Sequence, residues 1–130
     1  MSLADPADLP RAIAHAWGAR DAHALAGYFA PDADFLSLTG GSAEGAKEIA
    51  EIFAGELAGA FSRARLVTGK TKLRAVAGGA AVVITQRFVL SGIVHADGSD
   101  AGRIGAIFCA TMEPGPEGWW IVAAQFVPEA

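Results

Sequence analysis

The sequence predicts an α+β fold in which three N-terminal helices pack on a strongly curved, mostly antiparallel sheet. Two observations lead to this fold class. Apolar residues recur at helical spacing up to about residue 61, whereas four later segments are rich in β-branched and aromatic residues. A chain in which helices come first and strands follow is typical of domains whose helices cover one face of an antiparallel sheet. Such a bent sheet would enclose a cone with an internal pocket.

The first helix is expected to begin after Asp8, because an Asp followed by Pro10 in the first turn is a helix-start signal. Ile13 and Trp17 then fall on one face of this helix. A second, short helix is expected to begin after Asp21 and to continue to residue 29. Pro31 would end it, since proline cannot continue a helix.

A short strand is expected over residues 33–38, and a third helix over residues 43–58. Ile49, Ile52 and Phe53 lie at helical spacing and predict the buried face of that helix. Acidic residues, including Glu56, are expected on its solvated side. The four long strands are predicted at residues 63–76, 80–94, 103–113 and 118–127.

Length and composition limit the class of protein. The chain has 130 residues, of which 52% are hydrophobic and 18% charged, so we expect one folded domain over residues 1–130 rather than a disordered chain. No apolar run is long enough for a membrane span, and the first residues do not read as a secretory signal. Cys109 is the single cysteine, which excludes an internal disulfide. We therefore expect a cytoplasmic protein without a membrane partner.

Basic residues are concentrated in one part of the chain. Residues 57–96 contain six Lys or Arg residues and no acid. Lys70, Lys72 and Arg74 alternate with less polar residues, which predicts the wet face of a strand. An anion-binding or nucleic-acid-binding surface is the alternative, but the pI near 5.2 and the lack of interleaved aromatic residues argue against nucleic acid.

Three segments carry a resemblance to a known family. They are residues 18–35, with Gly18-Ala19-Arg20-Asp21 and Tyr28-Phe29-Ala30-Pro31-Asp32-Ala33-Asp34-Phe35; Gly45 leading into the helix of Ile49, Ile52 and Phe53; and residues 118–125. The chain resembles the nuclear transport factor 2-like superfamily, and within it the SnoaL-like and steroid-isomerase-like bacterial proteins. This resemblance implies a cystatin-like cone and a homodimer. The architecture hosts isomerases, cyclases, hydratases and binding modules, so it does not by itself choose a function.

The steroid-isomerase branch requires a carboxylate base, a tyrosine donor and a protonated acid. Counting along the resembling segments puts these positions on Ser37, Ile13 and Cys109, respectively. None of the three residues can supply the required group, so that isomerase activity is not expected. Asp34 and His95 remain as weak candidates for other acid/base chemistry. The three histidines lack ligand-type spacing and no cofactor motif is present, so no metal and no cofactor is expected.

An apolar pocket for a small apolar or aromatic molecule is the expectation that remains. Alternation along the last strand puts Ile121 and Gln125 on the inner face, where Gln125 would orient a ligand as a lone polar group. The predicted pocket residues are Trp17, Phe29, Ser37, Phe53, Phe61, Cys109 and Gln125.

The same alternation puts Trp120, Val122 and Phe126 on the outer face. An apolar outer face is unusual for an antiparallel sheet, so we expect a second subunit to cover it in a homodimer. Three hypotheses on function stay open: a small-molecule-binding protein, a SnoaL-like isomerase, polyketide cyclase or hydratase that uses Asp34, His95 or a bound water, and a structural dimerisation module whose cavity is filled by its own side chains.

Overall fold

The computed structural model describes residues 3–129; the ends of the predicted domain 1–130 (Met1, Ser2 and Ala130) lie outside the described residues. The helices are α1 (Leu9–Gly18), α2 (Ala22–Ala26) and α3 (Ala46–Ala58), with short 3-10 turns at Pro6–Asp8 and Ala77–Gly79. The strands are β1 (Phe29–Leu36), β2 (Ser42–Glu44), β3 (Arg65–Val76), β4 (Ala81–Val94), β5 (Asp100–Gly115) and β6 (Gly118–Pro128).

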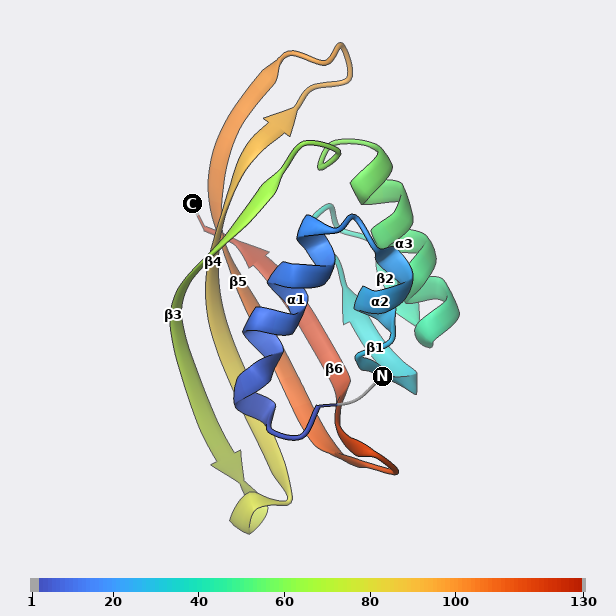
Figure 1. Ribbon diagram of the computed structural model, residues 1–130, viewed down its shortest axis with the longest axis vertical. Coiled ribbons are helices and arrows are strands. Elements are labelled where there is room, and N and C mark those ends of the chain that lie inside the picture. The colour runs from blue at the N-terminus through green and yellow to red at the C-terminus, as the bar shows by residue number, and fades with distance from the viewer. Residues whose placement is uncertain (1–2, 130) are drawn as a thin grey trace.

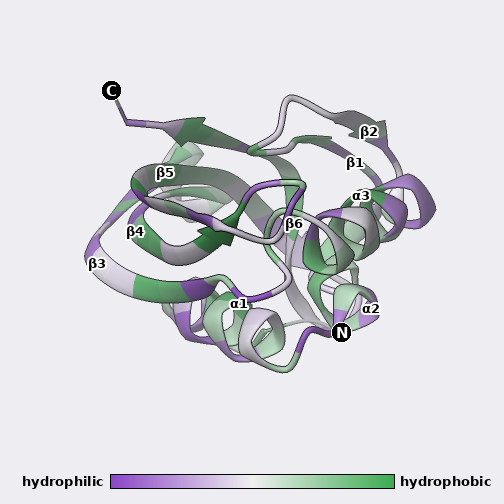
Figure 2. Ribbon diagram, turned by 90° about the horizontal axis from the view of Figure 1, so that it is seen from above, coloured by the Kyte–Doolittle hydropathy of each residue, from purple (hydrophilic) through white to green (hydrophobic). Residues whose placement is uncertain are grey.

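One six-stranded sheet has the strand order β2-β1-β6-β5-β4-β3. Only β1 and β6 run parallel, and all other neighbours are antiparallel. The three helices cover one face of the sheet. The long strands β3, β4 and β5 form the strongly curved part of the sheet, on the left in Figure 1. Seen from above, the strands bend around α1 (Figure 2). The predicted α+β fold class is therefore confirmed.

The second helix is shorter than predicted. The side chain of Asp21 caps α2 by accepting a hydrogen bond from the backbone N–H of Ala24 at 2.9 Å, as the sequence suggested. However, α2 ends at Ala26, and β1 begins at Phe29 and runs through Pro31. Proline is tolerated in this strand because the pairing of β1 with β6 is irregular between Phe29 and Asp34, where its missing N–H breaks no regular bond.

The third helix begins later than predicted because a short strand precedes it. In β2, Ala43 pairs with Phe35 of β1. Gly45 then leaves the sheet with φ of +87°, a conformation that glycine adopts without strain, and donates its N–H to the Ala33 carbonyl at 2.8 Å. A three-residue strand is too short to show an alternating pattern, so the sequence did not reveal it.

A β-bulge interrupts β6 in the middle of the sheet. Thr111 of β5 pairs with Ala123, and the next residue, Met112, pairs with Ile121, so that Val122 is the extra residue. A bulge of this kind breaks the period-two alternation of side chains. Beyond Val122, the residues that face the helices are therefore the even-numbered ones.

This bulge reverses two placements made from the sequence. Phe126 was expected on the outer face, but it is only 7% exposed and packs in the core. Gln125 was expected inside, but its side chain is exposed on the outer face. Alternation along a strand predicts a face only where the pairing register is continuous, and the register is not continuous here.

Candidate functional site

Aromatic side chains fill the space between the sheet and the helices. The ring of Phe35 stacks on Phe53 with centroids 5.0 Å apart and meets the edge of Phe29 at 5.4 Å. On the sheet side, Phe126 lies 4.7 Å from Phe108 by the same measure and 6.2 Å from Phe35. These rings contact one another, so Phe53 serves as core packing rather than as the wall of an open cavity.

Trp17 and Phe61 form a second aromatic contact at the start of β3. Their ring centroids lie 5.6 Å apart, and both side chains are buried. The Trp17 indole donates a hydrogen bond to the Ala64 carbonyl at 3.1 Å. Arg20 donates to the same carbonyl at 2.7 Å, which anchors the end of α1 to the chain before β3. Both predicted pocket residues therefore lie in packed surroundings.

Ser37 is buried in a small polar network that the sequence analysis missed. Its hydroxyl accepts a hydrogen bond from the Gly41 N–H at 2.9 Å and lies 3.2 Å from the Thr39 hydroxyl. The Thr39 hydroxyl donates to Glu56 of α3 at 2.6 Å. Glu56 was expected on the solvated side of the helix, but it is 8% exposed. Glu56 lies four residues after Ile52 and three after Phe53, so helical spacing already puts it on the buried face of α3. Its acidic character was wrongly taken as a sign of the solvated side, and only its partner Thr39 could not be predicted from spacing.

A hollow lies between α2, α3 and the turn that joins β5 to β6. This groove has a volume of about 780 Å³. Most of its lining is apolar or glycine: Ala26, Gly27, Phe29, Pro31, Ala46, Ala50, Pro116 and Trp120. Phe29 is the one predicted pocket residue that it contains. Trp120, which the sequence analysis assigned to a dimer face, also lines this groove.

Four residues with titratable side chains lie at the groove. They are His23 of α2, Lys47 and Glu51 of α3, and Glu117 of the β5–β6 turn, and all four are exposed. Lys47 and Glu51 are four residues apart, so they lie on the same face of α3. The groove thus combines an apolar floor with polar groups at its rim, an arrangement found in many small-molecule sites.

A second hollow of about 510 Å³ lies on the outer face of the sheet, over β2, β1, β6 and β5. Cys109 and Gln125 pair across β5 and β6 and both line this hollow, with Asp34 of β1. Ile13 is buried in α1, on the helix side of the sheet. The structure therefore does not bring together the three positions matched to steroid isomerases, since Cys109 and Ile13 lie on opposite faces.

His95 lies in a third hollow of about 500 Å³, between the β4–β5 hairpin and the segment after α3. Its side chain is exposed, and no acid lines the hollow with it. Nearby in the hairpin, the hydroxyl and N–H of Ser99 donate to Asp97 and lower the pKa of that carboxyl. Asp34 and His95 lie in separate hollows, so they do not form an acid/base pair.

Comparison with known proteins identifies the family. A family model described as a SnoaL-like domain matches residues 11–121, which is most of the chain. The chain belongs to the SnoaL-like family. This confirms the resemblance to the nuclear transport factor 2-like superfamily, of which SnoaL-like domains are part. A search of curated proteins finds no match.

Solved structures share the fold of this SnoaL-like chain at low sequence identity. A protein with a cystatin-like fold from Caulobacter vibrioides is 16% identical with a TM-score of 0.84, over 95% of this chain and 87% of its own. LinA is 17% identical with a TM-score of 0.82, over 95% and 83%. A proposed aromatic ring hydroxylase from Novosphingobium aromaticivorans is 19% identical with a TM-score of 0.79, over 95% and 86%. At these identities the likeness shows the fold alone.

Within residues 3–129, no three His, Cys, Asp or Glu side chains gather as a metal-binding group. None of the helices in this described part of the SnoaL-like chain is long and apolar enough to cross a membrane.

Proposed function

We propose that this SnoaL-like chain binds a small apolar or aromatic molecule in the groove between α2, α3 and the β5–β6 turn. The observation that carries the proposal is the groove of about 780 Å³ with an apolar floor. Small-molecule sites in proteins are typically about 300–1,000 Å³ and are lined mostly by apolar side chains, with a few polar groups. The groove meets each of these conditions.

The packing inside the cone supports the groove as the binding place. Phe35 packs against both Phe53 and Phe126 where an internal ligand would lie. A ligand there would have to displace close-packed rings, at a large cost in free energy. The groove needs no such rearrangement, since Trp120 is already half-exposed along it.

The lining residues favour a flat, mostly apolar ligand. The indole of Trp120 offers a face on which an aromatic ring stacks, a contact worth about 0.5–1.5 kcal/mol beyond the buried area. Lys47 and His23 on one pair of helices, and Glu117 on the turn, would orient a single polar substituent of the ligand. The proposal names this class of molecule and no particular compound.

Two matched substitutions test the groove. Ala50→Trp puts a large side chain into the groove, whereas Ala54→Trp puts the same side chain on an exposed position of α3 that does not line it. Compounds from a panel of small aromatic molecules should raise the melting temperature of the wild type and of Ala54→Trp, because a ligand that binds only the folded state stabilises it. Ala50→Trp should lose this response. An equal rise in melting temperature for both variants would contradict the groove as the binding site.

The filled interior also favours a second candidate, a structural module without a ligand. In that case no compound of the panel would raise the melting temperature of the wild type. The variant Trp120→Phe would show the same lack of response to the panel. An isomerase, cyclase or hydratase is less favoured, because Asp34 and His95 lie in different hollows. We keep the cytoplasm as the proposed compartment, since the sequence offers Cys109 no second cysteine.

A further inference from the structure

The long strand β3 is the last strand on one side of the sheet, and within residues 3–129 no strand pairs with its far side. Its register with β4 is continuous from Thr71 to Val76, and residues 67–76 are all exposed. In an antiparallel pair, the backbone N–H and C=O groups of every second residue bond to the neighbouring strand, and those of the others point away from it. On β3 these outward groups form an open row of donors and acceptors.

The two faces of β3 carry different side chains. Leu73 pairs with the fully buried Ile84, so its side chain lies on the helix side of the sheet. Lys72 and Arg74 are its neighbours in the sequence, and alternation therefore puts them on the outer side. The helix-side positions of the regular stretch are uncharged, and Leu73 is 43% exposed among them. The strand thus presents an uncharged row and a basic row.

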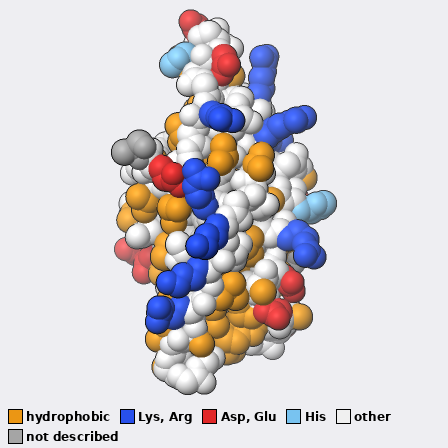
Figure 3. All heavy atoms as spheres, turned by 90° about the vertical axis from the view of Figure 1, so that its left-hand side faces the viewer, with side chains coloured by type: hydrophobic (Ala, Val, Ile, Leu, Met, Phe, Trp, Pro, Cys, Tyr) orange, Lys and Arg blue, Asp and Glu red, His pale blue; other side chains and the backbone are white. Residues whose placement is uncertain are grey.

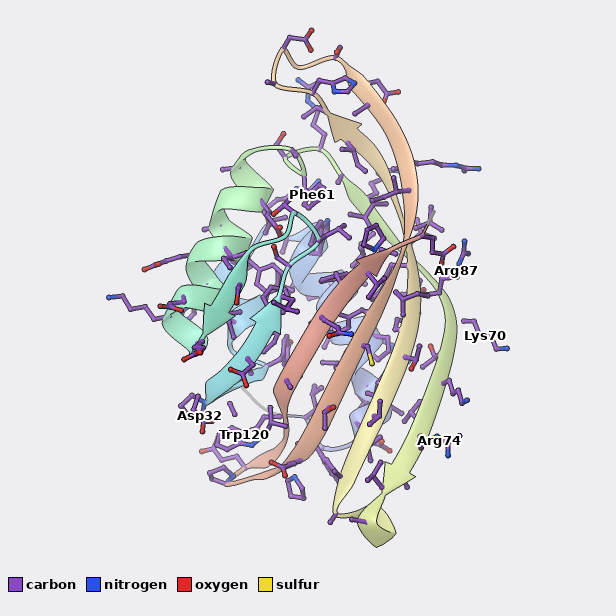
Figure 4. All side chains as sticks on the ribbon, turned by 180° about the vertical axis from the view of Figure 1, so that it is seen from behind. Asp32, Phe61, Lys70, Arg74, Arg87 and Trp120 are labelled. Atoms are coloured by element: carbon purple, nitrogen blue, oxygen red, sulfur yellow. The ribbon has the colours of Figure 1, made fainter. Side chains whose placement is uncertain are left out.

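The basic row consists of Lys70, Lys72 and Arg74, which occupy every second position. All three are exposed, and none has an ion-pair partner within residues 3–129. Basic side chains follow one another along the side of the molecule where β3 lies (Figure 3), and Lys70 and Arg74 project away from the sheet there (Figure 4). Since a strand rises about 3.3–3.4 Å per residue, alternate side chains lie about 6.7 Å apart.

This spacing and this charge indicate the partner. An extended peptide alternates its side chains with the same period, so acids at every second position would lie beside Lys70, Lys72 and Arg74. Apolar residues at the positions between them would cover Leu73. We propose that the free side of β3 binds an extended acidic peptide of this alternating pattern, which adds to the sheet as a further strand. Main-chain hydrogen bonds then supply affinity, and the two rows of side chains supply specificity.

Other partners fit this strand less well. If β3 paired antiparallel with β3 of a second copy about Lys72, Lys72 would face its own counterpart and Lys70 would face Arg74, which is unfavourable. A nucleic acid or an anionic membrane would extend past β3 toward the rest of a chain whose net charge is −4. No aromatic residue of β3 is available for stacking on bases. A short acidic segment avoids each of these conflicts.

The peptide site is separate from the proposed ligand groove, because no residue of β3 lines that groove. Synthetic peptides and the full wild-type chain test it. The probe is a fluorescein-labelled peptide in which glutamate alternates with valine, and fluorescence anisotropy gives its dissociation constant. A peptide of the same composition with its glutamates in one block keeps the charge and loses the alternation. It should bind at least about tenfold more weakly.

Methylated peptides test the main-chain hydrogen bonds separately from the charge. Methyl groups on either the glutamate or the valine backbone nitrogens block one edge of the alternating peptide. One of these two versions should lose binding, because its blocked edge faces β3, and the other should keep it. In hydrogen exchange, the alternating peptide should slow every second amide of residues 70–76, namely those that point away from β4.

Charge reversal on β3 tests the basic row. Lys72→Glu and Arg74→Glu should each weaken binding of the alternating peptide at least about tenfold. The variant with both changes should instead bind a peptide in which lysine alternates with valine. Arg11→Glu, the same change on the exposed side of α1, should leave both affinities unaltered. Circular dichroism establishes that each variant folds.

Three results would overturn the proposal without depending on any variant. The first is a wild type that does not bind the alternating peptide at millimolar concentration. The second is a block peptide that binds as tightly as the alternating one, which would assign the basic row to polyanions in general. The third is equal binding of the two methylated versions, which would mean that the backbone of β3 takes no part.

Discussion

Glu56 of α3 accepts a hydrogen bond from the hydroxyl of Thr39 at 2.6 Å, and this contact ties the helix to the loop after β1. The same carboxylate oxygen lies 3.4 Å from the backbone nitrogen of Thr39. Hydrogen bonds to an ionised carboxylate are stronger than those between neutral groups. The pair therefore fixes the entry of the β1–β2 hairpin relative to the third helix.

Replacing Glu56 with alanine should lower the free energy of unfolding by about 1–3 kcal/mol, because the Thr39 hydroxyl loses a charged acceptor and packing is lost. Urea unfolding measures the change. Glu51→Ala, an exposed acid on the same helix, should change it by less than about 0.5 kcal/mol. In a double-mutant cycle, Thr39→Val should be partly redundant with Glu56→Ala. Strictly additive effects would show that the two side chains do not interact.

The β6 bulge makes neighbouring residues differ sharply in their contribution to stability. Phe126→Ala removes a ring that packs on Phe108 and Phe35, and it should lower the unfolding free energy by about 3–5 kcal/mol. Gln125→Ala, one residue earlier on the exposed face, should change it by less than about 0.5 kcal/mol. Thermal or urea unfolding of both variants gives the comparison. The reverse order of effects would mean that alternation continues through β6 without a bulge.

The pairing of β3 with β4 shifts register between Thr68 and Thr71, and the fully buried amide of Gln86 braces this irregularity. Its side-chain N–H₂ donates to the Gly69 carbonyl at 3.2 Å, and its oxygen accepts a hydrogen bond from the Thr71 hydroxyl. Gln86→Leu should cost about 1–2 kcal/mol of unfolding free energy, since these groups lose their partner. Amide hydrogen exchange in residues 68–71 should become faster, whereas Thr85→Ala should leave those rates unchanged. Slow exchange in Gln86→Leu would remove the bracing role.

Arg87 and Glu129 form an exposed ion pair with an N–O distance of 2.7 Å. The hydrogen bond from Arg87 lowers the pKa of the Glu129 carboxyl below its usual range. Because the folded pKa lies below the unfolded one, the pair stabilises the fold above the unfolded pKa, and this contribution is lost as the pH falls through the folded pKa. The side chains are 46% and 34% exposed, so salt weakens the pair and its effect is small.

An NMR titration of the Glu129 carboxyl tests this pair. Arg87→Gln should raise the pKa of Glu129 toward that of a free glutamate, and high salt should do the same in the wild type. Arg103→Gln, a nearby base without this contact, provides the control. A pKa of Glu129 that stays low in Arg87→Gln would assign the shift to another cause.

The sequence predicted the fold class and the main elements because each depends on a local pattern. Helical spacing of Ile13 and Trp17 gave α1, and the cap at Asp21 gave the start of α2. Runs of β-branched and aromatic residues gave all four long strands. These signals need no knowledge of which elements become neighbours. The family resemblance, carried by short motifs, was likewise confirmed.

The candidate site was much harder to predict, because it depends on contacts between distant residues. The bulge at Val122 comes from pairing with β5, and it exchanged the faces of Gln125 and Phe126. The hydrogen-bond partner of the buried Glu56 is a threonine 17 residues earlier in the chain. The groove joins α2, α3 and a turn near residue 116, which no spacing rule relates. Only Phe29 of the predicted pocket residues belongs to it.

The free edges of the sheet have a consequence for solubility. One edge is β2, which offers only three residues, and the other is β3, which carries Lys70, Lys72 and Arg74. A bare strand edge can recruit further chains into an endless ribbon, and a short strand or a row of lysines obstructs that growth. Neutralising the basic side chains of β3, for example by lysine acetylation, would therefore leave the long edge open to fibrous aggregation.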